Sequence, residues 1–272
     1  MREGKVKVVG FKDGGEEECD LLMGADGVKS VVRKALFGEE EKFGPKYSGT
    51  SGVGGFLTTP LPSSVVDKRA MVFTFGRNGF FGYSSGGPPS TDSLMWWSIS
   101  GTDSLPSRQN LDRDEIKAKM QKRHANAADP VIRDVIAKAD VDSVYPTWVM
   151  PDLPHWGENG IVLVGDATHA LSPTTEQGVS QALEDAQTLS LLLGDTLKRA
   201  YGSVPPEETA SPAEQEKDAV AVSLKLLYNI RALRTKAIAE RGRRMDRPKT
   251  KMSAAQEYSM YCFFWLMMRF TF

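Results

Sequence analysis

The sequence predicts an α/β fold of mixed type, with both α/β and α+β features. Three observations support that prediction. The apolar run 161–164 ends at Gly165–Asp166 and precedes a helical pattern, as at the carboxyl end of a strand in a parallel sheet. Over residues 47–100, short apolar runs alternate with glycine-rich turns, which is typical of an antiparallel sheet. Beyond residue 212 the apolar residues follow a long helical spacing.

The composition is that of an ordinary globular protein. The chain has 272 residues, of which 40% are hydrophobic and 25% are charged, enough for one large or two small domains. A net charge of -1 gives no indication of a nucleic-acid partner. Cys19 and Cys262 are far apart and form no metal motif, so we expect no metal site. Two cysteines so far apart form no disulfide framework, which is typical of a reducing compartment, and the N-terminus has no apolar leader. We therefore expect a cytoplasmic location.

The N-terminal part is expected to begin with a hairpin. Residues 5–9 alternate as in a strand, 12–15 form a turn signal, and 18–23 read as the returning strand. Residues 24–27 then lead into a short helix that is closed by Gly38.

The middle of the chain is mainly helical. Residues 112–139 have a helical pattern that Pro130 breaks in two, and residues 141–145 read as one more strand. An amphipathic helix follows Gln177, and Gly194 is a candidate for its end. The expected buried face of that helix consists of apolar residues: Val179, Ala182, Leu183, Ala186, Leu189 and Leu193.

A long helix is expected over residues 213–244, and the basic residues of 231–244 are most simply a solvated face. The segment 260–268 is dense in large apolar side chains but too short to span a bilayer as a helix. Three interpretations stay open for it: a terminal helix docked on the core, a contact with a membrane surface, or a contact with a partner protein.

Two segments carry a resemblance to a known family. Residues 19–33 resemble the Asp-Gly motif of FAD-dependent monooxygenases of the aromatic-hydroxylase (p-hydroxybenzoate hydroxylase-like) family. Residues 165–173, with Gln177–Gly178 and Glu184–Asp185, resemble the second flavin motif of the same family. The resemblance implies an incomplete FAD-binding Rossmann-like domain, an inserted antiparallel-sheet substrate domain and C-terminal helices. The expected boundaries are 1–40 with 145–200, 41–144, and 201–272.

The resemblance assigns eight residues to an FAD site: Asp26, Gly27, Gly165, Asp166, Pro173, Gln177, Gly178 and Val179. It implies that Asp166 accepts hydrogen bonds from the ribityl hydroxyls, since one carboxylate can accept two at once. Gly165 lets the backbone approach closely, and Pro173 stiffens the loop beside the flavin. The N–H groups of Gly178 and Val179 would face the pyrimidine edge. Asp26 and Gly27 would lie near the pyrophosphate.

Other positions have expected roles as well. The family pattern makes Arg33 a support of the fold and His169 a structural residue rather than a base. Tyr83 is a weak catalytic candidate, and a core tyrosine with its hydroxyl at the edge is the favoured interpretation. Glu176 stands where many relatives have Gly or Ala, and its charge would oppose that of reduced flavin unless it turns to solvent.

The resemblance implies NAD(P)H-driven hydroxylation or epoxidation of an aromatic or polyketide-like small molecule, in the style of fungal secondary metabolism. The Gly-x-Gly-x-x-Gly unit that opens the family is absent, and glycine-rich 51–55 lies in the expected sheet instead. Three explanations stay open: a start site placed too far downstream, a second chain that supplies the missing FAD unit, or a flavin-free descendant that binds a small molecule or partner protein.

Overall fold

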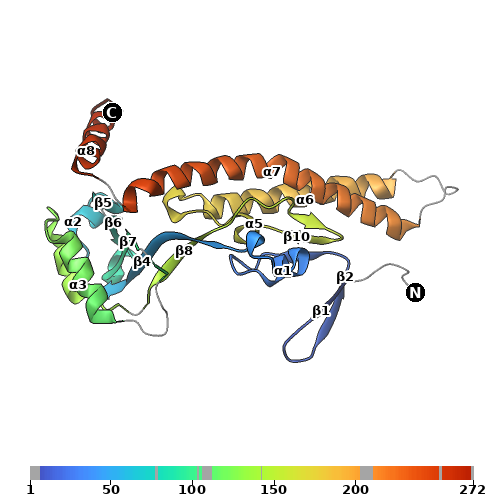
Figure 1. Cartoon of the computed structure of the whole chain (residues 1–272), viewed down its shortest axis with the longest axis horizontal. Coiled ribbons are helices and arrows are strands. Elements are labelled where there is room, and N and C mark those ends of the chain that lie inside the picture. The colour runs from blue at the N-terminus through green and yellow to red at the C-terminus, as the bar shows by residue number, and fades with distance from the viewer. Residues whose placement is uncertain are drawn as a thin grey trace. The chain divides into compact units, whose positions relative to one another are not determined.

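The computed structural model divides the chain into two compact units, and its elements are labelled in Figure 1. It describes residues 7–76, 79–102, 104–105, 112–141, 143–202, 211–250 and 253–270. Unit 1 consists of the described parts of Met1–Lys46 and Trp148–Arg243, and unit 2 of those of Tyr47–Thr147 and Arg244–Phe272. The mixed α/β class predicted from the sequence is confirmed, whereas the three-part domain division stays a prediction.

Unit 1 opens with a hairpin of β1 (Lys7–Gly10) and β2 (Glu16–Cys19), in which Lys7 pairs with Cys19. Residues 5 and 6 of the predicted first strand lie outside the described residues. The single returning strand predicted over 18–23 is wrong. The chain leaves the hairpin after Cys19, and Leu22–Gly24 forms a separate strand, β3, because it pairs with a distant partner.

That partner is β10 (Ile161–Leu163), the central strand of a three-stranded sheet in the order β3-β10-β9. β10 runs parallel to β3 and antiparallel to β9 (Gly157–Glu158). Val162 and Leu163 are fully buried, which explains why the strand reads as a continuous apolar run. A short helix, α1 (Val31–Phe37), follows β3 and ends at Gly38 as predicted.

Two long helices, α6 (Gly178–Gly202) and α7 (Pro212–Thr250), lie side by side (Figure 1). Unit 1 includes α6 and the part of α7 up to Arg243. The hydroxyls of Thr196 and Ser223 are 2.7 Å apart between them. Gly194 does not end α6, so that expectation is wrong. A glycine within a helix costs only about 1 kcal/mol relative to alanine, which packing along a long helix offsets.

The buried face of α6 also differs from the prediction. Val179 and Leu183 are 76% and 66% exposed, whereas Gln181, Asp185 and Leu189 are buried. Only Leu189 belongs to both the predicted and the observed buried sets. Polar contacts described in the next section decide the orientation of this helix.

Unit 2 contains the sheet expected in this region, which has five strands in the order β5-β6-β7-β4-β8. The strands are β4 (Lys46–Thr58), β5 (Val72–Gly76), β6 (Gly79–Ser85), β7 (Ser93–Gly101) and β8 (Tyr145–Val149). The pairs β5–β6, β6–β7 and β7–β4 are antiparallel. The glycine-rich run 51–55 lies within β4 as expected. The strand predicted over 141–145 is wrong, because the ladder begins only at Tyr145.

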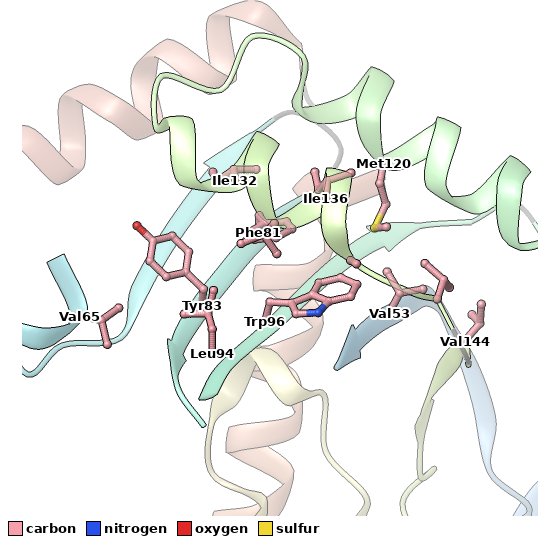
Figure 2. Packing of buried hydrophobic residues seen from close by; sticks show 13 residues of the cluster. Val53, Val65, Phe81, Tyr83, Leu94, Trp96, Met120, Ile132, Ile136 and Val144 are labelled. Atoms are coloured by element: carbon pink, nitrogen blue, oxygen red, sulfur yellow. The ribbon is translucent and has the colours of Figure 1, made fainter. Parts of the chain in front are cut away.

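Helices pack on this sheet to form the core of unit 2. Figure 2 shows Met120 of α3 (Arg113–His124) and Ile132 of α4 (Pro130–Lys138) near Phe81 and Trp96 of the sheet. The rings of Phe81 and Trp96 stack with centroids 6.0 Å apart. The predicted break at Pro130 is confirmed, since proline begins the second helix where no N–H donor is needed.

The C-terminal helix α8 (Ala254–Phe270) belongs to unit 2 and contacts it through two aromatic residues. The Tyr261 hydroxyl donates to the carbonyl of Phe75 at 2.8 Å, and the rings of Phe264 and Phe75 stack 5.6 Å apart. Within the described ranges we find no helix with the length and hydrophobicity needed to cross a membrane.

Candidate cofactor site

Two loops that are remote in sequence leave the sheet of unit 1 at the same edge. β3 and β10 run parallel with Gly24 opposite Leu163, and the Val164 N–H donates to the Gly24 carbonyl at 3.1 Å. The loops that follow carry Asp26–Gly27 and Gly165–Asp166. The carboxyl ends of parallel strands are where α/β proteins place their ligands.

Arg33 ties these two loops together. Its guanidinium donates to the carbonyl of Ala167 at 2.9 Å and to that of Val28 at 2.7 Å. Only 3% of Arg33 is exposed, so these bonds satisfy a buried charge. The supporting role expected of this arginine matches these contacts.

Asp26 caps the helix that follows its loop. Its Oδ2 accepts from the N–H groups of Val31 at 2.6 Å and Val32 at 3.2 Å. Burial favours a higher pKa for Asp26, but the hydrogen bonds from Ser30 and from these N–H groups hold it below its ordinary value. Gly27 has φ +77°, a conformation that favours glycine. The carboxylate remains exposed.

Gly165 forms the turn between β10 and α5 (Asp166–His169) with φ +60°. A Cβ at this position would lie 3.2 Å from that of Ala182, so glycine suits both the backbone angle and the space. The Gly165 carbonyl accepts from the Thr168 N–H at 2.9 Å, which closes the turn. Asp166 is exposed, whereas Ala167, Thr168 and His169 are buried.

The remaining predicted residues lie on the connection into α6. Pro173 is exposed and begins a single turn of 3-10 helix, and Glu176 ends that turn with φ +52°. Gln177 accepts from the Gln181 N–H at 2.9 Å. Gly178 begins α6, and no atom lies within 4 Å of a Cβ built there. Together with exposed Val179, these residues form an open surface at the helix start.

A buried polar cluster behind this surface was missed from the sequence. Arg231 of α7, only 3% exposed, donates to Asp185 Oδ1 at 2.9 Å and to Gln181 Oε1 at 2.7 Å. It also pairs with Glu184. Asp185 Oδ2 in turn accepts from the Gly165 N–H at 2.9 Å. The expectation that the basic residues of 231–244 form a solvated face is therefore wrong for Arg231.

The same carboxylate holds His169. The His169 Nε2 lies 2.6 Å from Asp185 Oδ2, and both side chains are buried. Burial favours a higher pKa for Asp185, but the hydrogen bonds from His169, Gly165 and Arg231 hold it below its ordinary value. The spacing of Gln181 and Asp185, one turn apart on a helix, is the sequence signal that this cluster offered.

Tyr83 belongs to unit 2, whereas the residues above belong to unit 1. It is 1% exposed, and its hydroxyl donates to Asp129 Oδ2 at 2.6 Å. Burial and this carboxylate raise the pKa of Tyr83 to about 12. These are the contacts of a core tyrosine, and its catalytic role stays a prediction. No group of three or more metal-binding side chains is present among the described residues.

Comparison with known proteins shows to which family this chain belongs. The family model for the FAD binding domain matches residues 3–204. The chain is 31% identical over 198 residues to 6-hydroxynicotinate 3-monooxygenase of Bordetella bronchiseptica, covering 68% of this chain and 47% of the relative. It is 28% identical over 211 residues to chloroplastic zeaxanthin epoxidase of Nicotiana plumbaginifolia, covering 77% of this chain and 30% of the relative.

Solved structures agree in fold. HpxO of Klebsiella pneumoniae, solved with FAD and uric acid, superposes with a TM-score of 0.69 at 19% identity, over 96% of this chain and 59% of that one. A salicylate hydroxylase substrate complex gives 0.66 at 17% identity, over 94% and 61%. The chain thus spans less than two thirds of the length of each of these proteins. With most of its length matched by the family model, the chain belongs to the FAD binding domain family.

Proposed function

We propose that this chain forms part of an FAD-dependent monooxygenase that hydroxylates or epoxidises an aromatic or polyketide-like small molecule, with NAD(P)H as reductant. One observation carries the proposal. The parallel pairing of β3 with β10 brings the Asp26–Gly27 and Gly165–Asp166 loops to one edge of a sheet, within a chain that belongs to an FAD-binding family. The names of the relatives support the reaction class, since they include a monooxygenase and an epoxidase.

The residues at this edge fit FAD. Asp166 offers an exposed carboxylate, an acceptor suited to the vicinal hydroxyls of a ribityl chain. Gly178 leaves room beside the first turn of α6, where helix N–H groups and the helix dipole favour a polar, electron-rich edge. Glu176 is exposed, so its side chain has access to solvent rather than only to the flavin. These features support Asp166 and Gly178, and we propose that the other residues named by the resemblance complete the cofactor surface: Asp26, Gly27, Gly165, Pro173, Gln177 and Val179.

Each part of the surface has a role in the proposed mechanism. When bound, FAD supplies the redox and oxygen chemistry, and the protein supplies binding, orientation and exclusion of water. Asp166 holds the ribityl chain, and the N–H groups of Gly178 and Val179 orient the pyrimidine edge. Arg33 donates to Val28 of the first loop and to Ala167 of the second, and Asp185 accepts from Gly165 of the second, so these two side chains hold both loops in position.

The substrate class rests on the relatives and on the site together. HpxO was solved with uric acid, and the other relatives are named for hydroxynicotinate, salicylate and zeaxanthin. We propose a planar or conjugated small molecule for this chain. We also propose a cytoplasmic location, with which two free cysteines are consistent. We further propose a role in fungal secondary metabolism, and a second chain as one source of additional FAD contacts.

The decisive experiment is an FAD titration followed by flavin fluorescence. Asp166→Asn keeps the size of the side chain but removes the charge that strengthens hydrogen bonds from hydroxyls. We expect it to weaken FAD binding by about tenfold or more, since a hydrogen bond to a charged group contributes about 1.5–3 kcal/mol.

Asp195→Asn is the matched control. Asp195 lies on α6, its side chain is 58% exposed, and it pairs with Arg199 one turn along the same helix. We expect this variant to bind FAD as the unchanged chain does. Equal affinity in the Asp166 and Asp195 variants would remove Asp166 from the site, and a chain that takes up no FAD would contradict the proposal for this chain.

A further inference from the structure

One glycine of α7 packs against the turn 172–176, which precedes α6. Gly242 is buried, although its neighbours Arg241 and Arg243 are exposed. A Cβ atom built on Gly242 would lie 2.7 Å from Cγ2 of Thr175 and 3.5 Å from Cβ of Ser172. Two carbon atoms in contact are normally about 3.5–4.0 Å apart, so the first of these distances leaves no room for a side chain. Glycine is therefore the residue that fits this contact.

The turn 172–176 carries part of the proposed cofactor surface. Pro173 lies within it and Gln177 follows it directly, and both belong to the eight residues proposed for FAD. Ser172 at the start of the turn is buried, whereas Pro173 and Glu176 are exposed. The turn thus packs into unit 1 at one end and presents the proposed FAD contacts to solvent.

Thr175, the residue that Gly242 contacts, holds the two ends of the turn together through its hydroxyl. The Thr175 Oγ1 donates to the carbonyl of Ser172 at 2.8 Å and accepts from the N–H of Gln177 at 3.4 Å. Oγ1 and Cγ2 are attached to the same carbon atom, so a rotation that moves Cγ2 away from α7 also breaks these hydrogen bonds. A methyl group placed against Cγ2 would therefore displace the turn rather than one side chain.

The helix on the other side of this contact is held by buried residues. Arg231 and Thr235, each 3% exposed, lie at helical spacing on the same face of α7 as Gly242. Arg231 is bonded to Asp185 of α6 at 2.9 Å. Because these buried contacts oppose a shift of α7, the partly exposed turn is the side that would move if Gly242 gained a side chain.

We propose that Gly242 is a positioning residue for the cofactor surface. Its missing side chain lets α7 pack closely against the turn 172–176, which holds Pro173 and Gln177 in place for FAD. Gly242 lies beyond residues 3–204, the part that the family model matches, so membership of the family does not assign this role. The role towards FAD rests on the proposed function, whereas the packing of α7 on the turn is a property of the chain without FAD.

The test adds one methyl group at the contact with Gly242→Ala. In the FAD-free chain the turn relieves the clash by moving outward, and FAD binding requires it to return, so the cost of overpacking appears in the affinity. We expect the Kd for FAD, measured by flavin fluorescence, to rise about fivefold or more. The N–H groups of Thr175 and Glu176 donate within the turn at 3.0 Å. In the FAD-free variant we expect their hydrogen exchange, resolved to single amides, to be faster by about fivefold or more.

Two further variants provide the control and the rescue. Gly194→Ala is the matched control, because Gly194 also lies within a long helix and no atom is within 4 Å of a Cβ built there. We expect it to change neither the FAD affinity nor the exchange of the turn. Thr175→Ser keeps the hydroxyl and removes Cγ2, so combined with Gly242→Ala it removes the clash. We expect this double variant to match Thr175→Ser alone in both measurements.

Each outcome decides the proposal. Equal results for Gly242→Ala and Gly194→Ala would overturn it, and so would a double variant that stays as impaired as Gly242→Ala. Faster exchange with unchanged affinity would overturn the role towards FAD. If Gly242→Ala does not fold, as judged by circular dichroism, recovery of the fold in the double variant supports the contact and its failure contradicts it.

The proposed function and this inference can fail separately. If the unchanged chain took up no FAD, the proposed function would fail for this chain. The exchange rates of the FAD-free variants would still decide whether Gly242 holds the turn in place.

Discussion

Arg231 donates to three side chains of α6 although only 3% of its own surface is exposed. A guanidinium presents five donors in a fixed fork, which suits one cation shared by several acceptors. Asp185 also accepts from the Gly165 N–H, so Arg231 is linked through Asp185 to the turn that carries Asp166. The orientation of α6 is therefore set by polar contacts as well as by apolar packing.

Replacing Arg231 tests this account. Arg231→Met removes the charge but keeps much of the volume, and it leaves the buried carboxylate of Asp185 without its cation. We expect the free energy of unfolding to fall by about 3–5 kcal/mol in urea titrations. Arg234→Met is the matched control, because Arg234 also pairs with Glu184 but is 57% exposed, and we expect it to lose less than about 1 kcal/mol. Similar losses in both variants would contradict the account.

Glu176 holds a left-handed conformation, with φ +52° and ψ +21°, that glycine adopts at lower cost. We expect Glu176→Gly to raise the free energy of unfolding by about 0.5 kcal/mol, after the greater chain entropy of glycine in the unfolded state is deducted. Glu176→Ala keeps the strained backbone conformation and should not raise the free energy of unfolding.

The same two variants test where the Glu176 side chain points. If it faces the flavin, both should raise the reduction potential of the flavin, measured by redox titration. An unaltered potential would mean that the side chain points to solvent.

At the scale of elements, local patterns predicted most of the secondary structure and failed where long-range partners decide. Gly38 and Pro130 marked real helix ends, because their backbone preferences act locally. The pattern 18–23 could not reveal that Leu22–Gly24 pairs with a strand about 140 residues later, since pairing leaves no local signal. Likewise, the apolar spacing of α6 gave the wrong face because Arg231 lies 46 residues beyond Asp185. The convergence of the two motif loops followed from the family resemblance rather than from periodicity.

The glycines of the unit 2 sheet make room for one aromatic side chain. Gly82 and Gly54 lie opposite Trp97 in the two flanking strands, and a Cβ at Gly82 would lie 2.4 Å from the indole. We expect Gly82→Ala to reduce the free energy of unfolding by about 1–3 kcal/mol, measured by thermal or urea denaturation. At Gly55 a Cβ would make an ordinary 3.6 Å contact, so Gly55→Ala is the control and should change stability little. A similar loss at both positions would show that backbone conformation, not space, is limiting.

His124 links the end of α3 to the sheet of unit 2 and makes its stability depend on pH. Its Nε2 is 3.3 Å from Ser98 Oγ, and its ring meets Phe81 edge-on. Burial and the charge of Arg123 lower the pKa of His124 from 6.5 to about 4. Between these values the unfolded chain takes up a proton that the folded chain does not. Stability is therefore complete above about pH 6.5 and falls by about 3 kcal/mol as the pH drops towards 4.

The variant His124→Gln isolates this effect, because glutamine retains a polar contact but does not titrate. We expect the loss of stability between about pH 7 and pH 4.5, measured by urea denaturation, to be smaller in the variant than in the unchanged chain. An identical pH dependence would mean that carboxylates alone account for it.

At the scale of the whole molecule, the proposed cofactor surface and the sheet differ in how they should respond to FAD. All eight residues proposed for FAD lie in unit 1, whereas Tyr83 and the five-stranded sheet belong mainly to unit 2. A ligand that binds only the folded state stabilises it by about 2.7 kcal/mol when present at about 100 times its dissociation constant. That gain should be concentrated in the unit that makes the contacts.

Hydrogen exchange with and without FAD measures this distribution. We expect slower exchange in peptides that cover the loop after β3, the Gly165–Asp166 turn and the first turn of α6, because their amides open less often when ligand is bound. Peptides from β6 and β7 should exchange at the same rate in both conditions. Asp166→Asn, mixed with the same concentration of FAD, should show much less protection. Equal slowing of β6 and of the turn at Gly165 would mean that the ligand contacts are not confined to the loops at the end of β3 and β10.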